Sequence, residues 1–218
     1  MMPYYEQDGI VIYHGDAARV LPYLEPVDLL LTDPPYGIGE ARGKNKSRSK
    51  LAVSRDYGVS DWDDTPPPRW LLDQAVGMAR SAVVFGGNYF HLPPAKCWLV
   101  WDKDNGDSDF ADCELAWTNL DKAVRKLTFR WAGMLTEPGC PKEDRVHPTQ
   151  KPEAVMRWAL MQAPDSRTVL DPFMGSGTTL VACKRLGRLA IGIEREERYC
   201  EIAAKRLSQG ALPLEIVG

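Results

Sequence analysis

An apolar run at residues 29–32 ends in a carboxylate, two prolines and an aromatic residue: Asp33, Pro34, Pro35 and Tyr36. The carboxylate can accept hydrogen bonds, the prolines fix the backbone, and the tyrosine ring offers a face for stacking. The same residue types are also typical of an ordinary turn at the end of a strand. Taken alone, this segment does not decide between a turn and a site.

A second candidate segment lies near the C-terminus, at residues 168–196. An apolar run reaches Asp171, a turn with Gly175 and Gly177 follows, and then come a helical pattern and a second apolar run that ends in Glu194. This order is typical of a nucleotide-binding strand–helix–strand unit. The glycines allow a sharp turn, the helix N-terminus can bind an anionic group, and Glu194 can accept hydrogen bonds from ribose hydroxyls.

Three ligands could occupy such a unit. A triphosphate loop needs Lys and then Ser or Thr after its last glycine, whereas this chain has Thr178 and Thr179. A dinucleotide site favours a small residue three positions after the second glycine, where Leu180 stands. S-adenosylmethionine has a ribose and a carboxylate but no phosphate, so it fits a shorter turn. A turn that binds nothing is the remaining alternative.

The two segments together resemble the amino-group DNA methyltransferases. The chain has "DPPY" at 33–36, "RVHPTQKP" at 145–152, "DPFMGSGTT" at 171–179 and "GIE" at 192–194, and similar segments are "YHGDA" (13–17), "VVFGGNYF" (83–90) and "WLVWDK" (98–103). In this order the catalytic motif precedes the cofactor motif, as in the permuted beta class of the family. The resemblance covers residues 10–205, and the motifs are specific when they occur together in this order.

The resemblance implies methyl transfer from S-adenosylmethionine to an exocyclic amino group of a flipped DNA base. The amino nitrogen is a poor nucleophile because its lone pair is delocalised into the ring. The Asp33 carboxylate and the Pro34 carbonyl would accept its two hydrogens, Pro35 would hold the backbone, and Tyr36 would stack on the base. Asp at the first motif position favours N6 of adenine over N4 of cytosine within the family.

The resemblance also implies a set of cofactor-binding residues. They come from the segment beside the cofactor adenine, the catalytic motif, the "HPTQKP" segment, the glycine turn and the end of the following strand: Asp16, Ala17, Asp33, His147, Thr149, Lys151, Asp171, Pro172, Phe173, Gly175, Ser176, Gly177, Thr178, Glu194 and Arg195. Lys151 is a candidate for the cofactor carboxylate, with a surface lysine as the alternative. His147 is equally consistent with ligand contact and helix capping.

Basic side chains concentrate in two places, although the chain has a formal net charge of −3. Residues 40–56 carry six basic side chains against two acidic ones, a net charge of +4, and the composition of 39–61 predicts a mobile loop. Larger members of the family carry a longer recognition insert, so the resemblance implies a reduced target-recognition region at about 119–146. The candidate DNA-binding residues are therefore Arg42, Lys44, Lys46, Arg48, Lys50, Lys122, Arg125, Lys126 and Arg130.

Apolar runs alternate with helical patterns along the 218 residues, which predicts one α/β domain. Strands are expected at 9–15, 27–32, 82–87, 97–102, 113–118, 168–173 and 189–194, with a further strand near 127–131. Helices are expected within 65–82 and at 152–163, 178–187 and 196–208. The resemblance implies a Rossmann-like methyltransferase fold, a mostly parallel seven-stranded sheet with helices on both faces.

Other features limit the cofactor and the compartment. The five cysteines are scattered without a Cys-x-x-Cys pair, and the acid-rich stretch 104–114 lacks the spacing of a calcium loop, so no metal site is expected and this stretch is interpreted as a solvated loop. Ring-carbon methylation needs a nucleophilic cysteine, which usually follows a proline, whereas Cys140 precedes Pro141 and is interpreted as a loop residue. Without a signal-like start or a long apolar run, we expect a cytoplasmic protein with no membrane contact.

Four alternatives to an adenine-specific DNA methyltransferase stay open at this point. They are a cytosine-N4 DNA methyltransferase, an RNA methyltransferase, a methyltransferase for a protein amide, and an inactive nucleic-acid-binding relative. The intact motif at 33–36 argues against the inactive relative. Double-stranded DNA is the expected partner, and the small recognition region is compatible with a homodimer.

Overall fold

The computed structural model describes residues 1–37, 65–105, 111–132, 135–136 and 150–209. The basic segment at 40–56 and two candidate cofactor residues, His147 and Thr149, lie outside these described residues.

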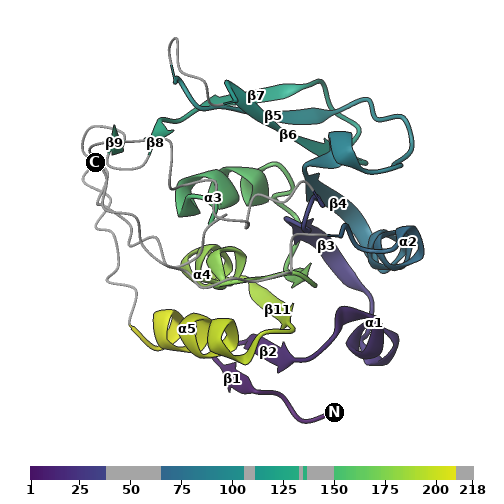
Figure 1. Ribbon diagram of the computed structural model, residues 1–218, viewed down its shortest axis with the longest axis vertical. Helices are drawn as coiled ribbons and strands as arrows, with labels where there is room; N and C mark the ends of the chain where they lie inside the picture. The colour runs from purple at the N-terminus through teal and green to yellow at the C-terminus, as the bar shows by residue number, and fades with distance from the viewer. Residues whose placement is uncertain (38–64, 106–110, 133–134, 137–149, 210–218) are drawn as a thin grey trace.

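A nine-stranded mixed sheet forms the centre of the described fold (Figure 1). Its strands stand in the order β1-β2-β11-β10-β3-β4-β6-β5-β7. Their bounds are β1 Tyr5–Gln7, β2 Ile10–His14, β3 Val27–Thr32, β4 Ala79–Phe85, β5 Trp98–Asp102, β6 Cys113–Thr118, β7 Arg125–Thr128, β10 Thr168–Asp171 and β11 Leu189–Glu194. A separate two-stranded sheet pairs β8 (Trp131–Ala132) with β9 (Leu135–Thr136).

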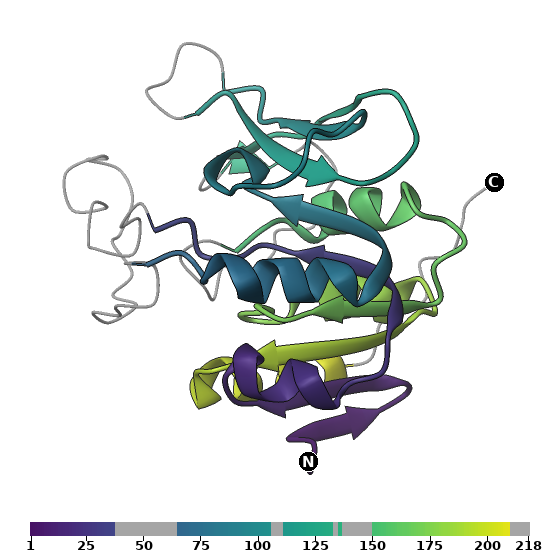
Figure 2. The same ribbon diagram turned by 90° about the vertical axis from the view of Figure 1, so that its right-hand side faces the viewer.

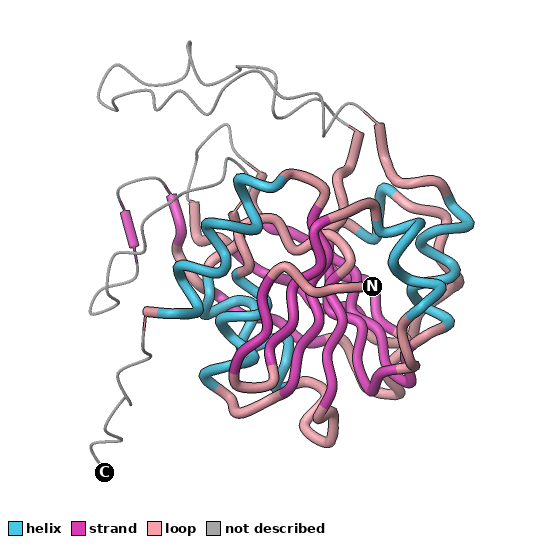
Figure 3. The backbone as a smooth tube through the Cα atoms, turned by 90° about the horizontal axis from the view of Figure 1, so that it is seen from below, coloured by secondary structure: helices cyan, strands magenta, loops and turns pink. Residues whose placement is uncertain are grey.

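Helices cover both faces of the sheet, as Figures 2 and 3 show. One face carries α1 (Ala17–Val20), the 3-10 turn η1 (Leu21–Tyr23) and α2 (Arg69–Gly77); the other carries α3 (Glu153–Met161), α4 (Thr178–Arg185) and α5 (Glu197–Ser208). Alternate residues of β3 divide between the faces. Leu29 and Leu31 pack with α3, α4 and α5, whereas Leu30 packs with α1 and α2. This explains why β3 is apolar throughout.

The predicted α/β fold with helices on both faces is confirmed, but the strand number and directions differ from expectation. Five of the eight strand pairings in the nine-stranded sheet are parallel; β1–β2, β4–β6 and β5–β6 are antiparallel. One missed strand, β1, is three residues long and joins β2 through Asp8 and Gly9, both at positive φ. An Asp-Gly pair is a hairpin signal that the sequence contained.

The helical pattern within 65–82 is shorter than predicted. The helix α2 stops at Gly77, and β4 already begins at Ala79 because Val27 of β3 pairs with Ala79. The strand expected near 127–131 is found as β7, two residues earlier. Strand pairing, which no local pattern shows, therefore sets both boundaries.

The strand order reverses between β3 and β10, and this places the two sequence motifs side by side. From β3 the chain proceeds to β4 on one side, and from β10 it proceeds to β11 on the other. The two central strands are parallel, with Leu29 opposite Val169 and Leu30 opposite Leu170. Asp33 and Asp171 therefore emerge at the same edge of the sheet. In open α/β sheets this is the place where ligands bind.

The glycine turn before α4 packs tightly against α5, and this contact is testable. Gly177 has a φ of 79°, and a Cβ there would lie 2.7 Å from the Ala203 Cβ. Gly177→Ala should therefore lose ~1–3 kcal/mol more stability than Gly187→Ala, whose φ is 65° but whose Cβ would meet open space. Thermal and urea unfolding of both variants measure this difference. Equal losses would show that the turn does not depend on close packing with α5.

Candidate active site

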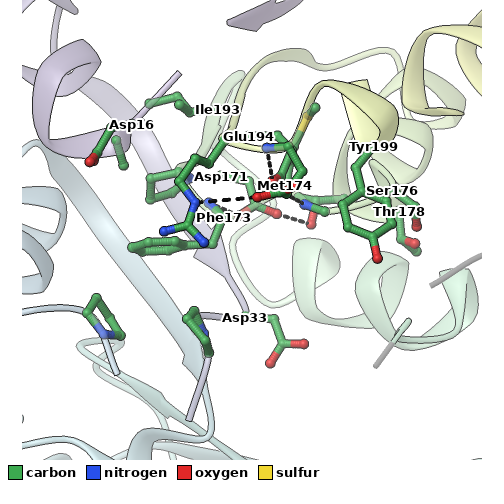
Figure 4. Close-up of a pocket in the computed structure, with 18 of the residues that line it drawn as sticks. Asp16, Asp33, Asp171, Phe173, Met174, Ser176, Thr178, Ile193, Glu194 and Tyr199 are labelled. Carbon is green, nitrogen blue, oxygen red and sulfur yellow. Dashed lines mark hydrogen bonds and ion pairs between the residues drawn. The ribbon is translucent and has the colours of Figure 1, made fainter. Parts of the chain in front are cut away.

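A cavity of about 330 Å³ opens at the C-terminal ends of β3, β10 and β11 (Figure 4). Twelve of the fifteen sequence-predicted cofactor residues line it: Asp16, Ala17, Asp33, Lys151, Asp171, Pro172, Phe173, Gly175, Ser176, Thr178, Glu194 and Arg195. Pro35 lines it as well, whereas Gly177, Pro34 and Tyr36 are not part of its wall. The structure thus brings residues from both ends of the chain around one space.

Asp171, at the end of β10, is a buried carboxylate that organises the floor of the cavity. It accepts hydrogen bonds from the Thr32 hydroxyl (2.8 Å), the Thr179 hydroxyl (2.6 Å) and the Phe173 backbone N–H (3.1 Å). Burial raises its pKa to about 6, although these hydrogen bonds oppose the shift. Asp171 therefore ties the end of β3, the glycine turn and the start of α4 together.

The glycine turn takes the conformation that its residues permit. Gly175 and Gly177 have φ values of 52° and 79°, which lie in the left-handed region that glycine adopts readily. The turn leads into α4, whose first residue is Thr178. Arg206 of α5 donates to the Ser176 carbonyl (2.7 Å) and lies 3.2 Å from the Thr178 hydroxyl. The turn is therefore held on both sides.

Glu194, at the end of β11, faces the cavity from the side opposite Asp33. Its two carboxylate oxygens accept the backbone N–H groups of Gly175 (3.0 Å) and Glu196 (2.8 Å). Burial raises its pKa, and these N–H groups counteract the shift. A carboxylate has about four acceptor positions, so two hydrogen bonds leave capacity for a ligand's hydroxyl groups.

Asp16 follows β2 and caps α1, because its side chain accepts the Ala18 N–H at 2.8 Å. The backbone N–H of Gly15 donates to the Glu194 carbonyl at 2.9 Å, which places Asp16 next to the end of β11. Both the helix-cap role and a place on the cavity wall are thus observed for this residue.

Asp33 lies at the centre of a hydrogen-bonded and ionic cluster. The Tyr36 hydroxyl donates to Asp33 Oδ1, and the Lys151 ammonium donates to Oδ2, both at 2.6 Å. Burial raises the pKa of Asp33, while Lys151 opposes this shift and Glu114 adds to it. The turn after β3 is therefore not an ordinary solvated turn, because it places a desolvated carboxylate at the cavity.

The ring of Tyr36 is held by the segment after β4. It stacks on Tyr89 of the 3-10 turn η3 (Gly87–Tyr89), with ring centroids 4.9 Å apart and planes inclined by 20°. Gly86 has a φ of 65°, and a Cβ there would lie 2.1 Å from the ring. The glycine is needed at this position because the Tyr36 ring approaches the backbone closely.

Glu114 is a charged residue of the site, and it lies where the strand expected at 113–118 overlaps the acid-rich stretch 104–114, which was interpreted as a solvated loop. For this residue the strand is confirmed and the loop is wrong. It belongs to β6, and it forms ion pairs with Lys103 (2.6 Å) and Lys151 (2.9 Å). Burial acts to raise its pKa, but the two ammonium groups lower it to about 2. A glutamate inside an apolar strand pattern was the available signal. Asp104 and Asp112 of the same stretch are exposed, as expected.

The four candidate DNA-binding residues in the described region do not form one free basic surface. Lys122 donates to the Gln162 carbonyl at 2.6 Å, Lys126 pairs with Asp102 at 3.0 Å, and Arg130 pairs with Asp104. Arg125 is exposed at the start of β7. Intramolecular partners therefore neutralise part of the positive charge that the sequence showed here.

Within residues 1–37, 65–105, 111–132, 135–136 and 150–209, no group of three or more His, Cys, Asp or Glu side chains is arranged to hold a metal ion. None of the helices in the described part of the chain has the length and apolarity needed to cross a membrane. The cysteines that the structure describes do not line the cavity, and burial raises the pKa of Cys200 to about 12.

Comparison with solved structures supports the fold. The chain aligns with M1.HpyAVI in complex with SAM at a TM-score of 0.57 and 26% identity, covering 91% of this chain and 98% of that one. It also aligns with the cytosine-N4-specific PvuII DNA methyltransferase at a TM-score of 0.58, over 94% of this chain and 88% of that one. At 16% identity, the second similarity shows the shared fold alone.

Comparison of sequences identifies the family. The Type II methyltransferase M2.LlaDCHI of Lactococcus lactis subsp. cremoris is 30% identical, over 96% of this chain and 93% of that protein. M2.DpnII of Streptococcus pneumoniae, also a Type II methyltransferase, is 28% identical over 94% and 92%. A family model described as DNA methylase matches residues 93–205. This chain, with its two motifs meeting at one cavity, therefore belongs to the DNA methylase family.

Proposed function

We propose that this protein transfers a methyl group from S-adenosylmethionine to N6 of adenine in double-stranded DNA, as a permuted beta-class enzyme with its catalytic motif at 33–36. The observation that carries the proposal is the position of Asp33. Asp33 lines the same cavity as Glu194 and the glycine turn. It follows β3, which is parallel to and paired with β10, the strand that leads into the glycine turn. A methyl donor in the cavity would thus lie beside an acceptor for the target amino group.

The cavity has the chemistry that S-adenosylmethionine requires. Glu194 offers acceptor positions for the ribose hydroxyls, and the N-terminus of α4, which begins at Thr178 in the cavity wall, can receive the carboxylate. Phe173 and Ile193 supply an apolar wall for the adenine ring. The relative M1.HpyAVI was solved as a complex with SAM, and this supports the same cofactor here.

The proposed reaction needs acceptors rather than a protein nucleophile. The amino nitrogen would attack the methyl carbon, and the carbon–sulfur bond would break with its electron pair moving to sulfur. The methylated nitrogen would then lose one proton to water. Asp33 and the Pro34 carbonyl accept the two amino hydrogens and favour the tetrahedral nitrogen that attacks. The sulfonium is already activated, so positioning and electrostatics supply the rest.

Adenine is proposed as the target because Asp33 stands first in the motif, which in this family favours adenine over cytosine. The base must leave the duplex to reach the cavity. The Type II methyltransferases among the relatives suggest a role as the modification enzyme of a restriction-modification system. A cytoplasmic location follows from that role.

The first test concerns Asp33. Asp33→Asn keeps the side-chain shape but removes the charge that accepts an amino hydrogen, so methyl transfer should fall by about 10²–10⁴-fold. Affinity for S-adenosylmethionine should change much less. The matched control is Asp73→Asn, an exposed residue on α2 that pairs with Arg69.

The readout is transfer of labelled methyl groups to duplex DNA, RNA and protein, followed by mass spectrometry of the modified product. N6-methyladenine in DNA supports the proposal, and N4-methylcytosine would replace the base assignment. Near wild-type turnover by Asp33→Asn would remove Asp33 from catalysis.

The second test concerns Glu194. Hydrogen bonds to a charged group contribute ~1.5–3 kcal/mol, so Glu194→Gln should weaken cofactor binding by about tenfold or more. Calorimetry without DNA measures the dissociation constant, and thermal unfolding checks that the glycine turn has stayed in place. Glu201→Gln, on the exposed side of α5, is the matched control. An unchanged dissociation constant would mean that the ribose does not bind at the end of β11.

The third test concerns DNA contacts. The segment at 40–56, proposed from its sequence charge to contact DNA phosphates, follows the catalytic motif directly. Replacing Lys44, Lys46, Arg48 and Lys50 by alanine should weaken duplex binding and reduce the salt slope by up to ~0.9 per lost contact. Arg125→Ala serves as a comparison, because Arg125 is an exposed candidate DNA-binding residue outside the segment 40–56. Parallel slopes with equal affinities would assign DNA binding to another surface.

A further inference from the structure

Four charged side chains of alternating sign form a continuous row next to the cavity. They are Asp33 after β3, Lys151 before α3, Glu114 on β6 and Lys103 after β5. Lys151 lies 2.6 Å from Asp33 and 2.9 Å from Glu114, and Lys103 lies 2.6 Å from the other oxygen of Glu114. Glu114 is thus the link between the catalytic carboxylate and the outer lysine, a role that neither the motifs nor the comparisons assign.

The ammonium of Lys151 is surrounded by protein oxygens. An ammonium has three N–H donors, and three oxygens lie within 3.2 Å of it: one from Asp33, one from Glu114 and the Tyr36 hydroxyl. The residue is 7% exposed and lies over the rings of Phe85 and Tyr36. This burial rules out the alternative of a surface lysine, and a contact between Lys151 and the cofactor carboxylate stays a prediction.

We propose that Glu114 is a positioning residue that shares Lys151 with Asp33, so that the ammonium neutralises the Asp33 carboxylate only in part and leaves it a stronger acceptor for the target amino group. This inference rests on the proposed function of Asp33. If Lys151 paired with Asp33 alone, its full positive charge would act on one carboxylate. Sharing between two carboxylates leaves Asp33 with more acceptor strength for an N–H hydrogen of the substrate.

The balance of charge makes this arrangement stable in a desolvated place. A buried charge is costly unless it is paired. Lys103, whose side chain is 18% exposed, supplies the second positive charge that Glu114 needs once Lys151 is shared. The four side chains together carry no net charge, and the Asp33 carboxylate at the inner end of the row faces the cavity.

Burial and the neighbouring charged and polar groups each act on the pKa of Asp33 in a defined direction. Burial raises the pKa of Asp33, Lys151 lowers it, Glu114 raises it, and the Tyr36 hydroxyl lowers it by donating a hydrogen bond. Asp171, at the end of β10, is also influenced by Asp33. Removing the charge of Glu114 should therefore lower the pKa of Asp33, whereas a change of shape alone would not.

The test measures that pKa directly, without relying on activity. Protein labelled with carbon-13 at the aspartate carboxyl groups is titrated by NMR, and the Asp33 resonance is identified by its absence in Asp33→Asn. In Glu114→Gln the Asp33 titration should move to lower pH, and turnover should fall about tenfold with the cofactor dissociation constant little changed. Asp112→Asn removes the same charge from an exposed position two residues earlier and should leave the titration in place.

Two further variants keep the inference falsifiable. Glu114→Asp retains the charge and should restore the wild-type titration in part. If Glu114→Gln does not fold, Lys103→Met removes a positive charge from the same row of side chains. Glu114 would then draw more strongly on Lys151, and the Asp33 titration should move to higher pH. An Asp33 titration that moves in neither Glu114→Gln nor Lys103→Met overturns the inference. Should Asp33→Asn itself retain normal turnover, the proposed role of Asp33 fails instead, whatever the titration shows.

Discussion

The pairing of β3 with β10 is the constraint on which the site depends. These strands are central and parallel; β10 ends in Asp171 and β3 is followed directly by Asp33, so both carboxylates lie at the same edge of the sheet. Two carboxylates in a desolvated place repel each other and lose hydration, so each needs compensation from its surroundings. The two carboxylates, Asp171 and Asp33, are stabilised in different ways.

Asp171 is compensated by neutral donors. Two threonine hydroxyls and one backbone N–H surround it, and its pKa of about 6 reflects burial that these donors offset only in part. Its hydrogen bonds hold the glycine turn, which makes its contribution structural. Asp33 is instead compensated by a lysine, which is itself shared with Glu114. A carboxylate paired with a shared cation remains a strong acceptor, and this suits it to the amino-group chemistry proposed here.

Local sequence patterns predicted much of the fold. The runs at 27–32, 113–118 and 189–194 are found as β3, β6 and β11 with the same bounds, because buried strands are apolar along their length. The glycine turn and Glu194 were also recognised, since a strand–turn–helix unit is contiguous in sequence. The antiparallel pairing of β5 with β6 was not predicted, because the partner of a strand is chosen by the whole sheet.

The charged network of the site shows the same limit. Asp33 and Lys151 were both singled out as candidate cofactor residues, and Asp33 also as the catalytic acceptor, but no contact between them was predicted. Glu114 was expected in the strand 113–118 but was given no role in the site. Their contact depends on β6 lying next to β4 and on the segment before α3 reaching across to the end of β3. Intramolecular partners of Lys122, Lys126 and Arg130 were equally invisible in the sequence, where they counted only as positive charge.

The most direct measurement of the central claim is a crystal structure of the protein with S-adenosylmethionine bound. We expect the ribose hydroxyls to bind Glu194 and the sulfonium methyl group to be directed toward Asp33. The methyl carbon would then leave space for an attacking nitrogen at ~3–3.5 Å. A cofactor whose ribose binds elsewhere, or whose methyl group points away from Asp33, would contradict the claim that the end of β3 and the end of β11 form one methyl-transfer site.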